Sequence, residues 1–159
     1  MKSSTGTWDY RFLGTDSYTY VSGSDFDGDG KTDPAKYVPA LNAVFWLKSS
    51  TGTWDYKFLG TDSYTYVSGS DFDGDGKTDP AKFVPALNAV FWLKSSTGTW
   101  DYKFLGTDSY TYVGASDFDG DGKTDPAKFL PSGWLLWLKS SAGTWDARYL
   151  GSDTYQLVN

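Results

Sequence analysis

The sequence is built around one ten-residue stretch, Ser24-Asp25-Phe26-Asp27-Gly28-Asp29-Gly30-Lys31-Thr32-Asp33, which returns letter for letter at 70–79 and 116–125. In each copy, four aspartates stand at positions 1, 3, 5 and 9 of a loop that also contains two glycines. Four carboxylates this close repel one another unless a cation lies among them. Carboxylate oxygens at alternating positions, with glycines that allow a tight turn, are typical of Ca²⁺ sites. The sequence therefore predicts three calcium sites per chain.

Each loop also has a lysine at position 7, whose backbone carbonyl is a further expected ligand and whose ammonium is expected to point away. The predicted ligands are Asp25, Asp27, Asp29, Lys31, Asp33, Asp71, Asp73, Asp75, Lys77, Asp79, Asp117, Asp119, Asp121, Lys123 and Asp125. An EF-hand is excluded, because position 12 holds Lys36, Lys82 or Lys128 where that motif needs a glutamate. A solvated turn rich in aspartate and glycine is the alternative for one copy. Three identical copies favour the metal site.

The composition indicates an all-β protein. Of the 159 residues, 19% are aromatic, and good helix formers are scarce beside Thr and Val. All 20 acidic residues are aspartates, and most lie in the three loops, so three Ca²⁺ would bring the net charge of −6 close to neutrality. No basic patch suggests a nucleic-acid partner. The sequence contains neither a signal peptide nor an apolar run of membrane-spanning length, so no membrane partner is expected.

Two segments together resemble a known repeat family. The loop 25–33 is followed by Pro34, and Lys48–Trp54 reads Lys-Ser-Ser-Thr-Gly-Thr-Trp. This combination resembles the FG-GAP/VCBS-type repeats of bacterial extracellular proteins, which are similar to the blades of integrin α-subunits. The resemblance covers nearly the whole chain. It implies a β-propeller with calcium between the first two strands of each blade, and an extracellular or cell-surface parent protein. The chain departs from the family's usual aliphatic residue at Pro34, Pro80 and Pro126.

A repeat period organises the chain. The Lys-Ser-Ser motif begins at residues 2, 48, 94 and 139, so its spacing is 46, 46 and 45 residues. Within one period we expect four strands, exemplified by Tyr18–Val21, Ala35–Val38, Ala43–Leu47 and Thr7–Leu13. Four strands in one such period are typical of a propeller blade. The near-identity of the copies indicates recent duplication or design.

The repeats divide one domain, 1–159, into three blades and two orphan strands. We expect blades at 16–61, 62–107 and 108–152, the outer strand of an incomplete blade at 1–15, and the inner strand of another at 153–159. Three blades are too few to close a ring. We therefore expect a homo-oligomer that closes the ring, with a homodimer favoured over a trimer or larger ring. A monomeric β-trefoil is the alternative, because three four-stranded repeats fit this length.

The composition also argues against an enzyme. The chain has no His and no Cys, which removes Ser-His and Cys-His nucleophile pairs. The aspartates outside the loops, such as Asp9 and Asp16, recur in every copy, as structural residues do. No catalytic residues are therefore predicted.

The recurring tryptophans are the other candidate site. Trp8, Trp54, Trp100 and Trp145 are candidate stacking platforms for a carbohydrate, although packing between blades is the favoured role. We expect a calcium-binding repeat module for recognition or adhesion, with lectin-like glycan binding as one form of that function. A structural or protein-binding scaffold that assembles with itself is the alternative.

Overall fold

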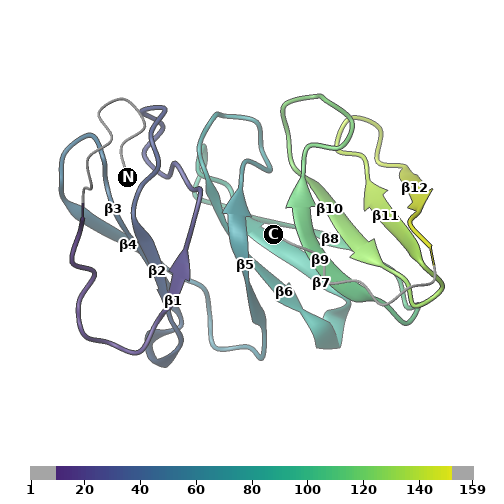
Figure 1. Cartoon of the computed structure of the whole chain (residues 1–159), viewed down its shortest axis with the longest axis horizontal. Helices are drawn as coiled ribbons and strands as arrows, with labels where there is room; N and C mark the ends of the chain where they lie inside the picture. The colour runs from purple at the N-terminus through teal and green to yellow at the C-terminus, as the bar shows by residue number, and fades with distance from the viewer. Residues whose placement is uncertain (1–9, 152–159) are drawn as a thin grey trace.

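The computed structural model describes residues 10–151, and this part of the chain is all-β (Figure 1). Its strands form three four-stranded antiparallel sheets. The sheets lie next to one another along the long axis of the molecule, in chain order (Figure 1). The prediction of an all-β chain made of four-stranded repeats is confirmed.

Each sheet is a meander in which consecutive strands pair. The first sheet contains β1 (Thr19–Val21), β2 (Ala35–Val38), β3 (Ala43–Leu47) and β4 (Trp54–Phe58). The second contains β5 (Thr65–Ser70), β6 (Asp79–Val84), β7 (Ala89–Leu93) and β8 (Trp100–Phe104). The third contains β9 (Thr111–Ser116), β10 (Asp125–Phe129), β11 (Trp134–Leu138) and β12 (Trp145–Tyr149). Within residues 10–151 no sheet combines strands of two repeats, whereas the barrel of a β-trefoil would require such pairing.

Two of the expected strands, Ala35–Val38 and Ala43–Leu47, have the bounds of β2 and β3. The expected strand Thr7–Leu13 is wrong in its described part, because residues 10–13 belong to no strand. Its counterpart β4 pairs with β3, and the described residues before position 14 have no such neighbour. The remainder of that strand and the inner strand expected at 153–159 lie outside the described residues.

Two short 3₁₀ helices, η1 (Pro39–Leu41) and η2 (Pro85–Leu87), were not anticipated from the sequence. Each ends at an asparagine with positive φ, 48° at Asn42 and 49° at Asn88. Asparagine tolerates this left-handed conformation better than most residues. The third repeat is one residue shorter here and has Gly133, with φ 88°, at the corresponding place.

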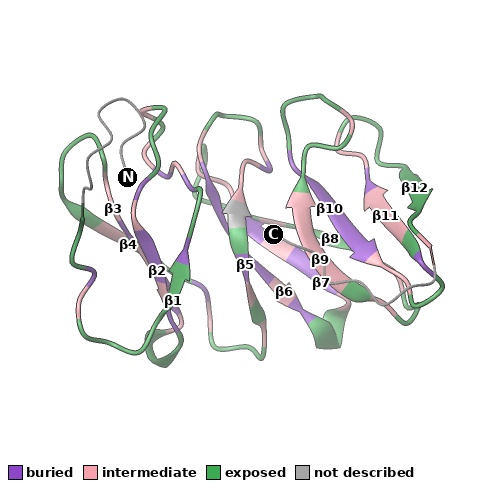
Figure 2. Ribbon diagram, viewed as in Figure 1, coloured by how far each residue is buried: buried purple, intermediate pink, exposed green. Residues whose placement is uncertain are grey.

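The core lies between neighbouring sheets. Figure 2 shows buried residues concentrated on the middle strands β2, β6 and β10, whereas β12 is exposed throughout. One cluster consists of Val21, Phe26, Ala35, Val44, Trp46 and Leu59, with Tyr37, Tyr64 and Tyr66 packed against it. Because Tyr64 and Tyr66 belong to the next repeat, they join the first sheet to the second. The second cluster is covered in the same way by Tyr110 and Tyr112. Among residues 10–151, no helix is long and apolar enough to cross a membrane.

Candidate metal centres

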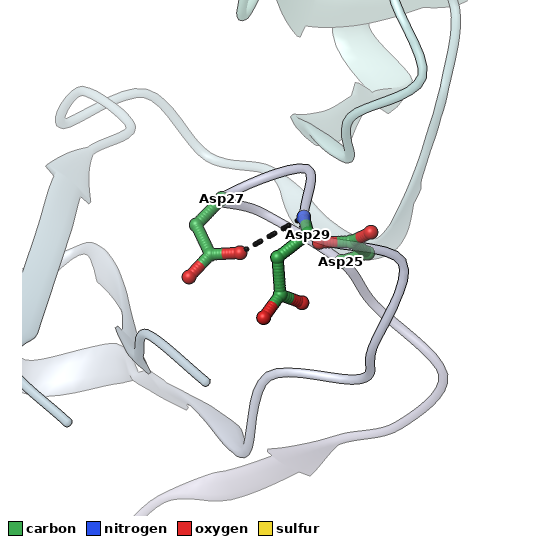
Figure 3. Close-up of side chains that lie close together, drawn as sticks. All are labelled: Asp25, Asp27 and Asp29. Atoms are coloured by element: carbon green, nitrogen blue, oxygen red, sulfur yellow. Dashed lines mark hydrogen bonds between the residues drawn. The ribbon is translucent and has the colours of Figure 1, made fainter. Parts of the chain in front are cut away.

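Each aspartate loop connects the first and second strands of its sheet. In every loop three carboxylates converge, with one oxygen from each lying within 4.8 Å of the others. The three groups are Asp25, Asp27 and Asp29; Asp71, Asp73 and Asp79; and Asp117, Asp119 and Asp125. Figure 3 shows the first group, in which the carboxylates of Asp27 and Asp29 lie side by side. Each group can hold a metal ion.

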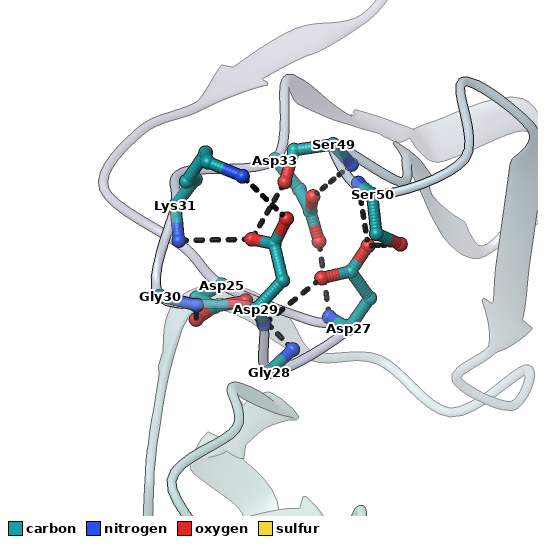
Figure 4. Close-up of polar contacts among 9 residues, drawn as sticks. All are labelled: Asp25, Asp27, Gly28, Asp29, Gly30, Lys31, Asp33, Ser49 and Ser50. Atoms are coloured by element: carbon teal, nitrogen blue, oxygen red, sulfur yellow. Dashed lines mark hydrogen bonds and ion pairs between the residues drawn. The ribbon is translucent and has the colours of Figure 1, made fainter.

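The buried carboxylate of the last aspartate holds the loop together through hydrogen bonds from backbone amides. Asp33 is fully buried, and its Oδ2 accepts a hydrogen bond from the Phe26 amide at 2.9 Å. The same oxygen accepts a hydrogen bond from the Asp27 amide at 3.1 Å (Figure 4). Its Oδ1 accepts a hydrogen bond from the Ser49 amide at 2.6 Å. Asp79 and Asp125 are also fully buried and make the equivalent contacts.

The contacts of the first aspartate explain why the loop needs glycine at two positions. Asp25 accepts hydrogen bonds from the amides of Gly28 at 2.7 Å and Gly30 at 2.8 Å, so the chain wraps around its carboxylate. The wrap requires positive φ at both positions, 79° at Gly28 and 81° at Gly30. Glycine adopts such angles without the steric cost that a Cβ imposes.

Sequence reasoning missed two serines at the site. Ser49 Oγ donates to Asp29 Oδ1 at 2.8 Å, and Ser50 Oγ donates to Asp27 Oδ2 at 2.6 Å (Figure 4). Both serines lie in the turn between β3 and β4, and the pair recurs as Ser95 with Ser96 and as Ser140 with Ser141. The signal in the sequence was the Lys-Ser-Ser motif, which follows every loop at a nearly constant distance.

The electrostatics of the loop separate the buried carboxylate from the exposed ones. Burial raises the pKa of Asp79 to about 6, and the nearby Asp73 carboxylate acts in the same direction. Burial likewise raises the pKa of Asp33. By contrast, the Ser49 hydroxyl holds the pKa of Asp29 below its ordinary value. The negative charges of Asp33 and Asp79 are therefore the ones that burial disfavours and that a nearby cation would stabilise most.

In the first loop, the side chain of the lysine at position 7 points in a different direction from the one expected. The Lys31 ammonium was expected to point away, but it lies 3.1 Å from Asp29 Oδ2, so that expectation is wrong for Lys31. Its long, exposed side chain folds back onto the nearest carboxylate. The aliphatic part of Lys77 instead packs against Gly28 of the preceding loop, and Lys123 packs in the same way against Gly74.

The candidate tryptophans stand beside buried lysines. Trp54, Trp100 and Trp145 begin the outer strands and are about half exposed, whereas Trp8 lies outside the described residues. Ammonium groups lie over these rings, at 5.1 Å between Lys82 Nζ and the Trp100 centroid and 4.7 Å between Lys128 Nζ and the Trp145 centroid. One role of these rings is therefore an internal cation–π contact.

Comparison of the chain with protein-family models, curated proteins and solved structures gives no significant match.

Proposed function

We propose that the chain is a calcium-binding repeat module for recognition or adhesion, in which one Ca²⁺ per loop stabilises each repeat. The observation that carries this proposal is the convergence of three carboxylates within 4.8 Å in every loop. The aspartates at loop positions 1 and 3 belong to all three groups, and the third member is Asp29 at position 5 in the first loop and Asp79 or Asp125 at position 9 in the others.

The chemistry of the donors fits calcium. The side-chain atoms that converge in each loop are carboxylate oxygens, and hard carboxylate and carbonyl oxygens are the ligands that Ca²⁺ prefers. In the first loop the proposed ligands are the carboxylates of Asp25, Asp27, Asp29 and Asp33 with the Lys31 carbonyl, and the other loops use the equivalent residues. A bound Ca²⁺ would neutralise the repulsion among these carboxylates. We expect an affinity in the range of extracellular modules, on the order of 10⁻⁴ to 10⁻³ M, and we propose a cell-surface or extracellular location.

Thermal melting with and without calcium tests the proposal. Calcium at a hundredfold excess over its dissociation constant would add about 2.7 kcal/mol per independent site to the free energy of unfolding. We expect the melting temperature to rise with calcium and fall in EDTA, and the triple variant Asp27→Ala, Asp73→Ala, Asp119→Ala to lose this response.

A matched control removes three carboxylates elsewhere. Asp55, Asp101 and Asp146 lie on the outer strands and pair with lysines instead of lining the loops. Their replacement by alanine is expected to leave the calcium response intact. A melting curve of the unmodified protein that is the same in EDTA and in calcium would contradict the proposal.

Exposed rings on the outer strands favour lectin-like glycan binding as a second candidate function. On β4, Trp54, Tyr56 and Phe58 are all exposed, and β8 repeats this row with Trp100, Tyr102 and Phe104. Repeated platforms of this kind would give weak single-site affinity with strong avidity for multivalent glycans. A glycan array in calcium buffer tests this form of the function, and the absence of binding at high protein density would leave the self-assembling scaffold.

A further inference from the structure

Neighbouring repeats are joined by the same contact twice within the chain. The Thr78 amide donates to the Asp25 carbonyl at 2.7 Å, and the Asp25 amide donates to Thr78 Oγ1 at 2.9 Å. One repeat later, the Thr124 amide donates to the Asp71 carbonyl at 2.7 Å. Each contact lies at an interface where two tyrosines of the following repeat pack against a core cluster of the preceding one. These are Tyr64 and Tyr66 at the first interface and Tyr110 and Tyr112 at the second. The contact is therefore a reusable interface with two different halves.

One half of this interface is exposed at the C-terminal end of the row of sheets. Phe118 is 41% exposed, whereas its counterparts Phe26 and Phe72 are 6% and 5% exposed. Phe118 nevertheless stacks on Trp137 with 5.0 Å between ring centroids, as Phe26 does on Trp46 at 4.6 Å. This C-terminal face, formed by Asp117, Phe118, Leu135 and Trp137, thus keeps the ring stacking that the internal interfaces bury.

The other half is exposed at the opposite end of the row, on the first sheet (Figure 1). Thr32 is exposed there, although Thr78 and Thr124 are buried. Tyr18 and Tyr20 are exposed as well. Their counterparts in the later repeats, Tyr64 with Tyr66 and Tyr110 with Tyr112, pack against the core clusters between sheets. This N-terminal face is formed by Tyr18, Tyr20, Thr32, Pro34 and Leu47.

The N-terminal face contains a cavity that is larger than the equivalent cavity between the first and second repeats. The cavity has a volume of about 480 Å³, and its lining includes Thr32, Pro34, Leu47 and Lys48. The equivalent residues of the second repeat, Thr78, Pro80, Leu93 and Lys94, line a cavity of only about 140 Å³. That smaller cavity is also lined by Phe26, Trp46 and Lys57 of the preceding repeat. The larger cavity is also lined by Tyr10, Arg11 and Leu13, and Arg11 is the counterpart of Lys57. Among the described residues, its lining has no counterpart of the Phe26–Trp46 pair, so a phenylalanine–tryptophan pair from another copy would complete it.

We propose that the N-terminal face binds the C-terminal face of a second copy of this chain, head to tail. The Phe118–Trp137 pair of one copy then enters the cavity of the next, and Thr32 meets Asp117 as Thr78 meets Asp25. Such a contact joins two different patches, so it closes into a ring or grows into a filament. Two copies would bring together six four-stranded sheets, a number within the range of about four to eight blades found in propellers.

One detail makes the contact between copies weaker than those within the chain. Tyr64 and Tyr110 donate to the side chains of Asn42 and Asn88, each at 3.4 Å. The third repeat has Gly133 at that place, so Tyr18 of a second copy would lack this acceptor. Assembly is therefore expected to depend on protein concentration.

Light scattering and native mass spectrometry of single variants test the contact. We expect the unmodified protein to assemble into species of at least twice 17.6 kDa. Phe118→Asp is expected to give a folded monomer, because the residue is already exposed. The matched control is Phe104→Asp, which alters an exposed phenylalanine on the outer strand β8 and is expected to leave assembly unchanged.

Mixing two variants tests the head-to-tail direction. Tyr20→Asp disables the N-terminal face, and Thr32→Asp is the second choice if that variant fails to fold. Each variant alone is expected to be monomeric, whereas an equal mixture with Phe118→Asp gives a heterodimer through its one intact pair of faces. A monomeric unmodified protein, a Phe118→Asp variant that assembles normally, or a mixture of folded variants that stays monomeric would overturn the proposal.

Discussion

The carboxylate of Asp79 accepts a hydrogen bond from the backbone amide of Ser95 at 2.6 Å, which ties the second aspartate loop to the turn after β7. Its other oxygen accepts hydrogen bonds from the amides of Phe72 and Asp73 inside the loop. Asp79 is also the first residue of β6 and is fully buried. The loop, the turn and the sheet therefore meet at one carboxylate, and its charge state affects the whole repeat.

The raised pKa of Asp79 predicts how the calcium-free protein responds to pH. Burial raises this pKa to about 6 from an ordinary value of 3.8. Between these values the folded state binds more protons than the unfolded state, so its stability falls as pH rises. The contribution is fully present below the unfolded pKa and is lost as pH rises through about 6. In EDTA we expect a higher melting temperature at about pH 5 than at about pH 7.5.

Melting in excess calcium is the control for this pH response. Calcium competes with protons for the same oxygens, so calcium binding favours the higher pH and should reverse the trend. Carboxylates with lowered pKa values, such as Asp62 and Asp101, titrate below this window and do not obscure it. A calcium-free protein that is more stable at the higher pH would contradict the prediction.

Gly133 is expected to tolerate no side chain. Its φ is 88°, and an added Cβ would lie 1.8 Å from the backbone oxygen of Gly151. Gly143 also has positive φ, 64°, but a Cβ there meets nothing within 4 Å. Urea denaturation should show that Gly143→Ala costs about 1–2 kcal/mol, from backbone strain alone. Gly133→Ala should cost several times more, and equal losses would show that the clash does not occur.

The buried ammonium of Lys82 is expected to matter more than its carboxylate partner. Lys82 Nζ donates to the Leu59 carbonyl and to Asp62, and it lies over the rings of Tyr64 and Trp100. Lys82→Met keeps the aliphatic stem but leaves the buried carbonyl without this donor, which should cost about 1–3 kcal/mol. Asp62→Asn changes an exposed partner whose ion pair is screened by solvent, and it should cost clearly less. A larger loss for Asp62→Asn in chemical denaturation would contradict this assignment.

The strands and the convergence of the aspartates could be predicted from the sequence because both follow local patterns. Ala35–Val38 and Ala43–Leu47 stand between clear turn residues, and each coincides with a strand. Alternating aspartates with intervening glycines wrap locally, so no distant part of the chain is needed to bring Asp25 and Asp27 together.

The contacts between distant segments could not be predicted in the same way. Ser50 reaches Asp27 across 23 residues, and that meeting depends on the length and direction of β2 and β3. From the sequence, Lys36 serves only to rule out an EF-hand. The structure places its ammonium in a buried site beside Asp16, because the surrounding rings and carboxylate compensate the charge. A strand lysine alone gives no sign of such partners.

Counting the calcium ions bound per chain tests the central claim most directly. Native mass spectrometry in calcium, supported by titration calorimetry, should find three Ca²⁺ per chain of the unmodified protein. The single variant Asp73→Ala should bind two, because the other loops keep all of their aspartates. Binding of no calcium by the unmodified protein, or of three ions by the Asp73→Ala variant, would contradict the account.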